Sequence, residues 1–197
     1  MHRKDEHIHH FMLSPSGRSS FWSVEFVHNC LPEKNFQDTN LETRYLGRTF
    51  RSPLFLNAIT GGTALTYKIN ASLADVSRIC KLPMAVGSQM AALENQVVEP
   101  SFRIVRRRNP KGTIWANIGA YATPEQALRI VDMIEADAIQ IHLNVPQELF
   151  MAEGDRNFSK YLSRIEMISA AVNVPVIVKE VGFGIAREQA LALNTTG

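Results

Sequence analysis

A repeating unit, one short apolar segment followed by one amphipathic helical segment, constrains the fold of this chain more than any other feature. The five apolar segments are residues 53–60, 83–88, 113–119, 137–145 and 175–181. Helical patterns follow them near 65–79, 102–108, 124–136, 161–171 and 186–193, and Thr123-Pro124-Glu125 is a typical helix start. Connections this long cannot form hairpins, so the segments are predicted to be parallel strands joined by right-handed crossovers.

The length of the repeat indicates which parallel fold is built. Equivalent points fall 25 to 37 residues apart, at Asn57, Val86, Asn117, His142 and Lys179. About eight such units, near 250 residues, close a TIM (β/α)8 barrel. We therefore expect an α/β chain of that barrel family in which only about the first five units are present, truncated at its carboxyl end and left with an exposed sheet edge.

Residues 1–50 differ from the rest and are predicted to be an N-terminal arm and lead-in segment, with residues 51–197 as the incomplete barrel domain. The arm has a basic, His-rich start and one predicted strand at 21–27. Its start is read either as an unstructured terminus or as a functional segment. A metal site on His7, His9 and His10 is disfavoured, because their spacing matches no standard helical pair.

Charge and composition exclude several classes of protein. Cys30 and Cys80 lie far apart in sequence, which argues against a disulfide framework and favours a reducing compartment. No stretch approaches the roughly 18 apolar residues of a membrane helix, and no signal peptide follows the charged start. We therefore expect a cytoplasmic protein without a membrane partner.

Polar residues follow each predicted strand, at the end where parallel α/β folds place their active sites. They are Thr60-Gly61-Gly62, Gly87-Ser88-Gln89, Asn117, the group His142, Asn144, Gln147 and Glu148, and Lys179. In the fourth segment Ile139, Ile141 and Leu143 alternate with Gln140, His142 and Asn144, so one face is apolar and the other polar. Buried polar groups cost free energy unless something satisfies them, so their coincidence indicates a ligand site.

The residue types at these strand ends suggest which ligand is bound. The sequence has no nucleophile elbow and no Walker-type glycine loop. Neutral amides, a hydroxyl and one lysine suit a planar polar cofactor such as a flavin, with Lys179 stabilising negative charge on the ring. Glu148 is a candidate Mg²⁺ ligand whose other ligands would be diphosphate oxygens.

The chain resembles one family, the flavin-dependent type 2 isopentenyl-diphosphate isomerases. The motifs that carry the resemblance are residues 3–7 (RKDEH), 57–62 (NAITGG), 87–89 (GSQ), 116–119 (ANIG), 142–148 (HLNVPQE) and 178–184 (VKEVGFG). This resemblance implies a (β/α)8 barrel that interconverts isopentenyl and dimethylallyl diphosphate in isoprenoid biosynthesis. It also implies reduced FMN, Mg²⁺, NADPH as flavin reductant and a homo-oligomer.

The resemblance also implies roles for individual residues. FMN contacts would be Ala58, Ile59, Thr60, Ser88, Asn117 and Lys179. Substrate contacts would be Arg3, Lys4, His7, Ser88, Gln89, Met90, Asn144 and Gln147, with Arg3 and Lys4 acting as a lid on the diphosphate. Catalysis would involve Gln147, His142 and Lys179, and Glu148 would bind the metal. Met90 stands where many members have Arg, and the family's remaining flavin-phosphate contacts lie in the last three units.

Three other functions remain open. One is an FMN-dependent oxidoreductase on the same barrel, and another is an inactive fragment or a scaffold-like binding module. The third is nucleic-acid binding, which would use Arg103, Arg106, Arg107, Arg108 and Lys111. A charge run at a helix end is usually a solvated face, so nucleic acid is not an expected partner.

Overall fold

The computed structural model describes residues 3–14, 25–152 and 154–197, and the chain forms two compact units, Met1–Pro53 and Leu54–Gly197. The first unit contains α1 (Arg3–Leu13), η2 (Phe36–Asp38) and an antiparallel pair, β1 (Thr43–Tyr45) and β2 (Arg48–Phe50). The rings of Tyr45 and Phe50 stack with centroids 4.2 Å apart. Of the strand predicted at 21–27, residues 21–24 lie outside the described residues, and 25–27 have no regular structure.

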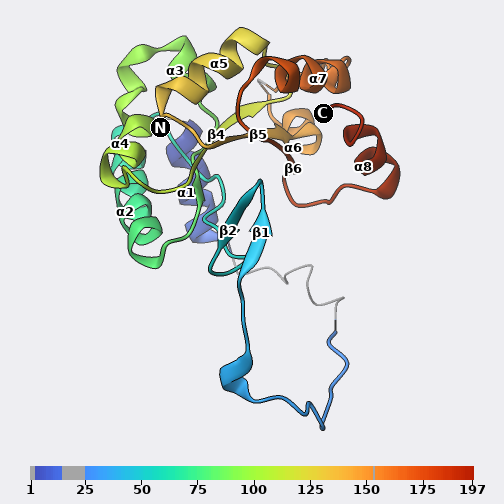
Figure 1. The fold of residues 1–197 in the computed structure, drawn as a ribbon. Helices are drawn as coiled ribbons and strands as arrows, with labels where there is room; N and C mark the ends of the chain where they lie inside the picture. The colour runs from blue at the N-terminus through green and yellow to red at the C-terminus, as the bar shows by residue number, and fades with distance from the viewer. Residues whose placement is uncertain (1–2, 15–24, 153) are drawn as a thin grey trace. The chain divides into compact units, whose positions relative to one another are not determined.

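The second unit is built on a four-stranded parallel sheet in the order β3-β4-β5-β6 (Figure 1). Its strands are β3 (Met84–Ala85), β4 (Ile114–Gly119), β5 (Ala138–Leu143) and β6 (Val176–Glu180). Its helices are α2 (Ala64–Cys80), α3 (Met90–Glu94), η3 (Gln96–Val98), α4 (Pro100–Arg108), α5 (Pro124–Met133), α6 (Val145–Phe150), α7 (Tyr161–Ala171) and α8 (Arg187–Leu193). The alternation of parallel strands and crossover helices confirms the predicted fold class, part of a TIM barrel.

The strand predicted at 53–60 is wrong in part, because only an isolated bridge between Leu56 and Met84 forms there. The segment still lies beside β3, since the Leu56 N–H donates to Pro83 O at 2.8 Å and the Gly87 N–H to Thr60 O at 3.0 Å. Asn57 Oδ1 accepts the N–H of Ala58 at 2.9 Å. This local side-chain bond competes with the ladder and explains why no regular strand develops.

Side chains of β4 and β5 alternate between two environments. Ile114, Ala116 and Ile118 of β4, with Ile139 and Ile141 of β5, are fully buried in the hydrophobic core. Helix residues of the same core cluster cover them: Ala127, Ile130, Ile134, Ile165 and Ile168. The residues between them in sequence therefore face the opposite, inner side of the sheet, as the alternation in the fourth segment predicted.

The buried face of α2 is more polar than its apolar residues suggest. Leu65, Val76 and Ile79 are exposed, whereas Thr66, Asn70, Ala74 and Ser77 are buried. The amide of Asn70 donates to Thr60 O at 3.2 Å and to Ser101 O at 2.8 Å. This buried amide fixes the end of the 53–60 segment against α4, and so positions the glycine pair that follows it.

Arg106 ties α4 to the loops that lead into β4 and β5. Its guanidinium donates to Gly112 O at 2.8 Å, to Ile134 O at 3.1 Å and to the carboxylate of Asp137 at 2.9 Å. Asp137 Oδ2 in turn accepts the N–H of Ile114 at 3.0 Å. One guanidinium thus holds together the starts of two neighbouring strands.

Two other arginines of the basic cluster, Arg103 and Arg108, also bind groups within the chain. Arg103 donates to Met133 O at 2.8 Å and pairs with Glu99, and Arg108 pairs with Asp75. Three of the five cations therefore have partners within the chain. Among the described residues, no helix is long and apolar enough to cross a membrane.

Candidate functional site

The inner face of the sheet carries a ladder of polar side chains at its carboxyl end. In the strand register Asn117 pairs with Gln140, and His142 pairs with Lys179. Asn117 Nδ2 donates to Gln140 Oε1 at 3.1 Å, and Asn117 Oδ1 lies 3.0 Å from His142 Nδ1. Asn117, His142 and Lys179 come from strands that are far apart in sequence. The structure brings these three predicted site residues together, with Gln140 as an additional member.

Two hydroxyls at the ends of the preceding segments are buried without a hydrogen-bond partner among the described residues. They are Thr60 Oγ1 and Ser88 Oγ. The segments approach closely, because a Cβ at Gly87 would come within 2.6 Å of the Thr60 backbone. A buried hydroxyl without a partner is costly, so these two atoms fit the polar edge of a bound group such as a flavin. Ala58 and Ile59 lie in the same segment, and Ile59 is 62% exposed.

Lys179 is a half-buried cation on the inner face of β6. Burial lowers the pKa of Lys179 below its usual 10.5, and the nearby Glu180 carboxylate opposes this shift. Its Nζ donates to the Glu180 backbone oxygen at 3.3 Å. A partly desolvated ammonium held by a backbone oxygen is well suited to attract an anionic ring or a phosphate.

Glu180 points to the loop after β6 and organises it. One carboxylate oxygen accepts the N–H groups of Gly182, Phe183 and Gly184 at 2.6, 2.5 and 3.0 Å. Burial acts to raise the pKa of Glu180, but these backbone donors outweigh it, so the pKa is lowered from 4.5. Glycine is needed at 182 and 184, where φ is +145° and +91°.

We expect this loop to loosen in acid. The pKa of Glu180 is lower in the folded state than in the unfolded state. The ionised carboxylate therefore stabilises the fold fully above about pH 4.5, and this stabilisation is lost as the pH falls through the lowered pKa. Amide signals of residues 182–184, followed by NMR from pH 7 to pH 3, should shift together with the Glu180 carboxyl. Glu180→Gln should give faster hydrogen exchange at these amides already at pH 7, and unchanged exchange would contradict this account.

The group after β5 lies on α6 and the residue before it. Asn144 Nδ2 donates to Gln147 Oε1 at 2.8 Å, while Asn144 Oδ1 is buried without a partner among the described residues. Glu148 Oε2 accepts the N–H of Asp155 at 3.0 Å. Arg156, which the sequence did not single out, donates to the backbone oxygen of Glu148. The loop after α6 thus fixes the position of the proposed metal ligand.

A metal here would depend on Glu148 and on oxygens from the ligand. The described residues contain no group of three His, Cys, Asp or Glu that could hold an ion. Mg²⁺ is commonly bound by one or two carboxylates together with phosphate oxygens and water, so a single carboxylate fits that ion.

Gln89 and Met90 have a different environment from the inner-face group. Gln89 is fully buried, and its Nε2 donates to Ile130 O at 3.1 Å, while its Oε1 accepts the Asn117 N–H at 3.1 Å. Both ends of this amide are therefore occupied in joining β4 to α5. Met90 is the first residue of α3 and packs against the core. Arg3, Lys4 and His7 belong to α1 in the first unit.

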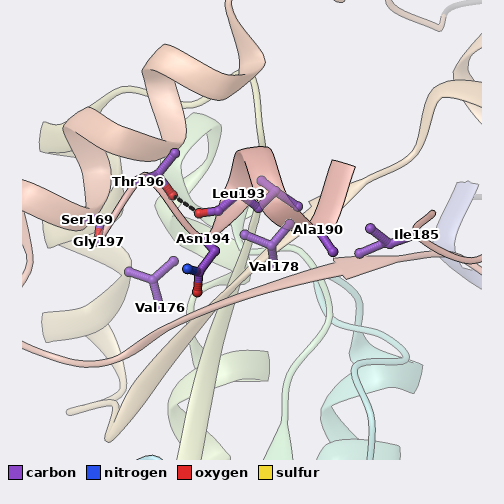
Figure 2. Close-up of a pocket in the computed structure, with 9 residues that line it drawn as sticks. All are labelled: Ser169, Val176, Val178, Ile185, Ala190, Leu193, Asn194, Thr196 and Gly197. Atoms are coloured by element: carbon purple, nitrogen blue, oxygen red, sulfur yellow. Dashed lines mark hydrogen bonds between the residues drawn. The ribbon is translucent and has the colours of Figure 1, made fainter. Parts of the chain in front are cut away.

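A cavity of about 340 Å³ lies on the other side of β6. Its lining includes Val176, Val178, Ala190, Leu193 and Asn194 from β6 and the segment at α8 (Figure 2). Val176 and Val178 pack against the hydrophobic core. They therefore lie on the face of β6 opposite to Lys179. None of the predicted site residues lines this cavity, so it is separate from the candidate site.

Curated relatives match almost the whole chain. The chain is 50% identical over 197 residues to the isopentenyl-diphosphate delta-isomerase of Geobacillus sp. (strain WCH70). It is 48% identical over 195 residues to the protein of that name from Moorella thermoacetica. In both comparisons 99% of this chain is aligned with 56% of the relative, so the chain spans about half the length of the curated relatives it matches. No family model matches.

Solved structures share the fold at low sequence identity. A mandelate oxidase variant matches with a TM-score of 0.55 and 15% identity, over 83% of this chain and 51% of that one. A mandelate oxidase with a monooxide FMN adduct matches with a TM-score of 0.56 and 14% identity, over 83% and 50%. These likenesses support the barrel architecture alone.

Proposed function

We propose that this chain forms part of an isopentenyl-diphosphate delta-isomerase, in which its inner-face residues bind reduced FMN and an isoprenoid diphosphate. The observation that carries the proposal is its identity of about 50%, over 99% of its length, to curated proteins of that name. The strand ends add independent support, because two hydroxyls that are buried without a partner among the described residues and a partly desolvated lysine suit a flavin.

In this proposal the flavin is held by residues from several strand ends. Ala58, Ile59, Thr60, Ser88 and Asn117 would contact the ring and its side chain. Thr60 Oγ1 and Ser88 Oγ, which have no hydrogen-bond partner in the part of the chain that the structure describes, would gain one from the flavin. Lys179 would supply a positive charge beside the ring, where negative charge accumulates on reduction. NADPH would serve as the reductant.

The diphosphate would be bound by a second group of residues. Glu148 would hold Mg²⁺, and Arg3, Lys4 and His7 would add positive charge or hydrogen bonds to the phosphate oxygens. Asn144 Oδ1, buried and unpaired among the described residues, would accept a bond from substrate or water. The resemblance assigns Ser88, Gln89 and Met90 to the substrate, whereas the buried Gln89 amide bonds Ile130 and Asn117 at its two ends.

The reaction needs one proton added to and one removed from an allylic system. Reduced flavin, when bound, supplies that acid and base. The chain's own residues would orient the carbon chain over the ring, with Gln147 at its allylic end and His142 beside it, and the diphosphate clamp would restrict its motion. Asn144 Nδ2 fixes the Gln147 amide through its 2.8 Å bond.

A chimaera tests this function. Residues 1–197 would be joined to the part of the Geobacillus relative that lies outside the alignment, which restores the relative's full length. With FMN, NADPH and Mg²⁺ the product should interconvert the two isoprenoid diphosphates. Glu148→Gln should lower Mg²⁺-dependent turnover by about 10²-fold or more, with flavin content unchanged. A flavin-loaded chimaera without isomerase activity would refute the proposal.

A second candidate is a flavin-dependent oxidoreductase on the same barrel, because neutral amides, a hydroxyl and a lysine at the strand ends would suit a flavin in either enzyme. In that case substrate would lose a hydride and bleach the oxidised flavin, whereas an isomerase should leave its absorbance unchanged. We also propose a homo-oligomer, as the resemblance implies, and a cytoplasmic location, as the composition of the sequence suggests. Sedimentation of the chimaera would test the oligomeric state.

A further inference from the structure

Gln140 is a buried amide on the inner face of β5 to which the proposed function assigns no role. It is 1% exposed and lies directly opposite Asn117 in the register of β4 and β5. Its Oε1 accepts a hydrogen bond from Asn117 Nδ2 at 3.1 Å. A fully buried amide at the level of the site, bonded to one of its members, can determine how that member is oriented.

The backbone of Asn117 is held rigidly from the other direction. Its N–H donates to Gln89 Oε1 at 3.1 Å, and its carbonyl accepts the Gln89 N–H at 2.9 Å. Gln89 is itself anchored to α5 through Ile130 O. Because the main chain is fixed, the remaining freedom of Asn117 is the rotation of its side-chain amide, whose Nδ2 is directed to Gln140 Oε1.

The orientation of this amide determines where His142 carries its proton. With Nδ2 committed to Gln140, Asn117 presents Oδ1 to His142 Nδ1 at 3.0 Å. An amide oxygen can only accept, so Nδ1 must be the ring nitrogen that bears hydrogen. Proton gain and loss by the ring then take place at Nε2.

We infer that Gln140 is a positioning residue that, through Asn117, holds His142 in the Nδ1–H tautomer, so that Nε2 is the atom that exchanges protons. The charged group that faces His142 from the adjacent strand is Lys179, and β4 presents Asn117 and Gly119. The significance of this tautomer for isomerisation rests on the proposed function. The tautomer itself does not, because the three side chains fix it without a ligand.

Nitrogen NMR of the ¹⁵N-labelled 197-residue chain tests the inference. The His142 signals would be assigned by their loss in His142→Asn. Above the pKa of the ring, Nδ1 should show the shift of a protonated ring nitrogen and Nε2 that of an unprotonated one. The opposite pattern in the unmodified chain would overturn the inference, and this measurement needs no variant to fold.

Three variants separate positioning from general structural support. In Gln140→Leu, the Asn117 amide is released, so the Nδ1–H form should fall from dominant to a minority of neutral His142. Adding Asn117→Asp to Gln140→Leu should restore it, because a carboxylate offers only acceptors. Asn109→Ala, which removes a buried amide bonded to Ser77, should leave the tautomer unchanged. Persistence of Nδ1–H in Gln140→Leu, or no restoration in the double variant, would contradict the inference.

These measurements distinguish the inference from the proposed function. The NMR readout requires no flavin, metal or substrate, so an inactive chimaera would leave it untouched. If both hold, Gln140→Leu in the chimaera should change the pH dependence of turnover, and Asn117→Asp in the same background should move the profile toward higher pH, since a carboxylate raises the pKa of a neighbouring imidazole.

Discussion

Replacing Arg106 by alanine is expected to lower the free energy of unfolding of this chain by about 3 kcal/mol. The ion pair with Asp137 is mostly buried, with 14% and 18% of the two side chains exposed. The same guanidinium also bonds backbone oxygens of Gly112 and Ile134. Its loss leaves a poorly solvated carboxylate without its cation and several carbonyls without a donor, which costs more than a surface ion pair is worth.

Urea denaturation at pH 7 would measure this effect, with Arg107→Ala as the matched control. Arg107 is the next residue on the same helix and is exposed, so its replacement should change the unfolding free energy by less than about 0.5 kcal/mol. Equal midpoints for the Arg106 and Arg107 variants would show that the guanidinium contributes no more than a solvated charge.

Replacing Lys179 by methionine is expected to lower flavin-dependent turnover strongly while making the fold more stable. Burial lowers the pKa of Lys179, so between that value and 10.5 the folded state binds fewer protons than the unfolded state. Stability therefore rises with pH across this window, and the cost of desolvating the charge is fully present below the lowered pKa. Methionine has similar length without the charge and avoids that cost.

Two measurements check the Lys179 prediction. Turnover by the chimaera should fall by about 10²–10³-fold, as when one electrostatic donor is removed from an active site. Denaturation of the 197-residue chain should give a higher midpoint for Lys179→Met than for the unmodified chain at pH 7, with the difference shrinking as the pH approaches 10.5. Lys179→Arg keeps the charge and should gain no stability. A less stable methionine variant would contradict the desolvation argument.

Most of the fold could be predicted from the sequence because residues that are close together in sequence determine where most helices and strands begin and end. The helix start at Thr123 is confirmed, since its hydroxyl accepts the Gln126 N–H and Pro124 occupies the first turn. The strands β4, β5 and β6 agree with the apolar segments to within about two residues. Alternation alone also predicted which face of β5 would be polar.

Features that depend on long-range contacts could not be predicted. The apolar segment predicted to run to residue 145 ends as a strand at Leu143, because the next helix, α6, begins at Val145 with Pro146 in its first turn, a position that favours proline. The pattern placed Gln89 at a strand end, but its amide bonds Ile130, 41 residues away. The alternation contained Gln140 without assigning it to the site, because its role depends on its pairing with Asn117 across two strands.

The polar inner ladder has a consequence for folding specificity. Side chains on a strand alternate with a period of two, so a slip of β5 by one residue would turn Gln140 and His142 toward the helices and Ile139 and Ile141 toward the opening. In the apolar layer the Gln140 amide and the His142 imidazole would lose their hydrogen-bond partners, which would lower the free energy of unfolding by several kcal/mol. The polar side chains of the candidate site thus also disfavour incorrect registers of β5.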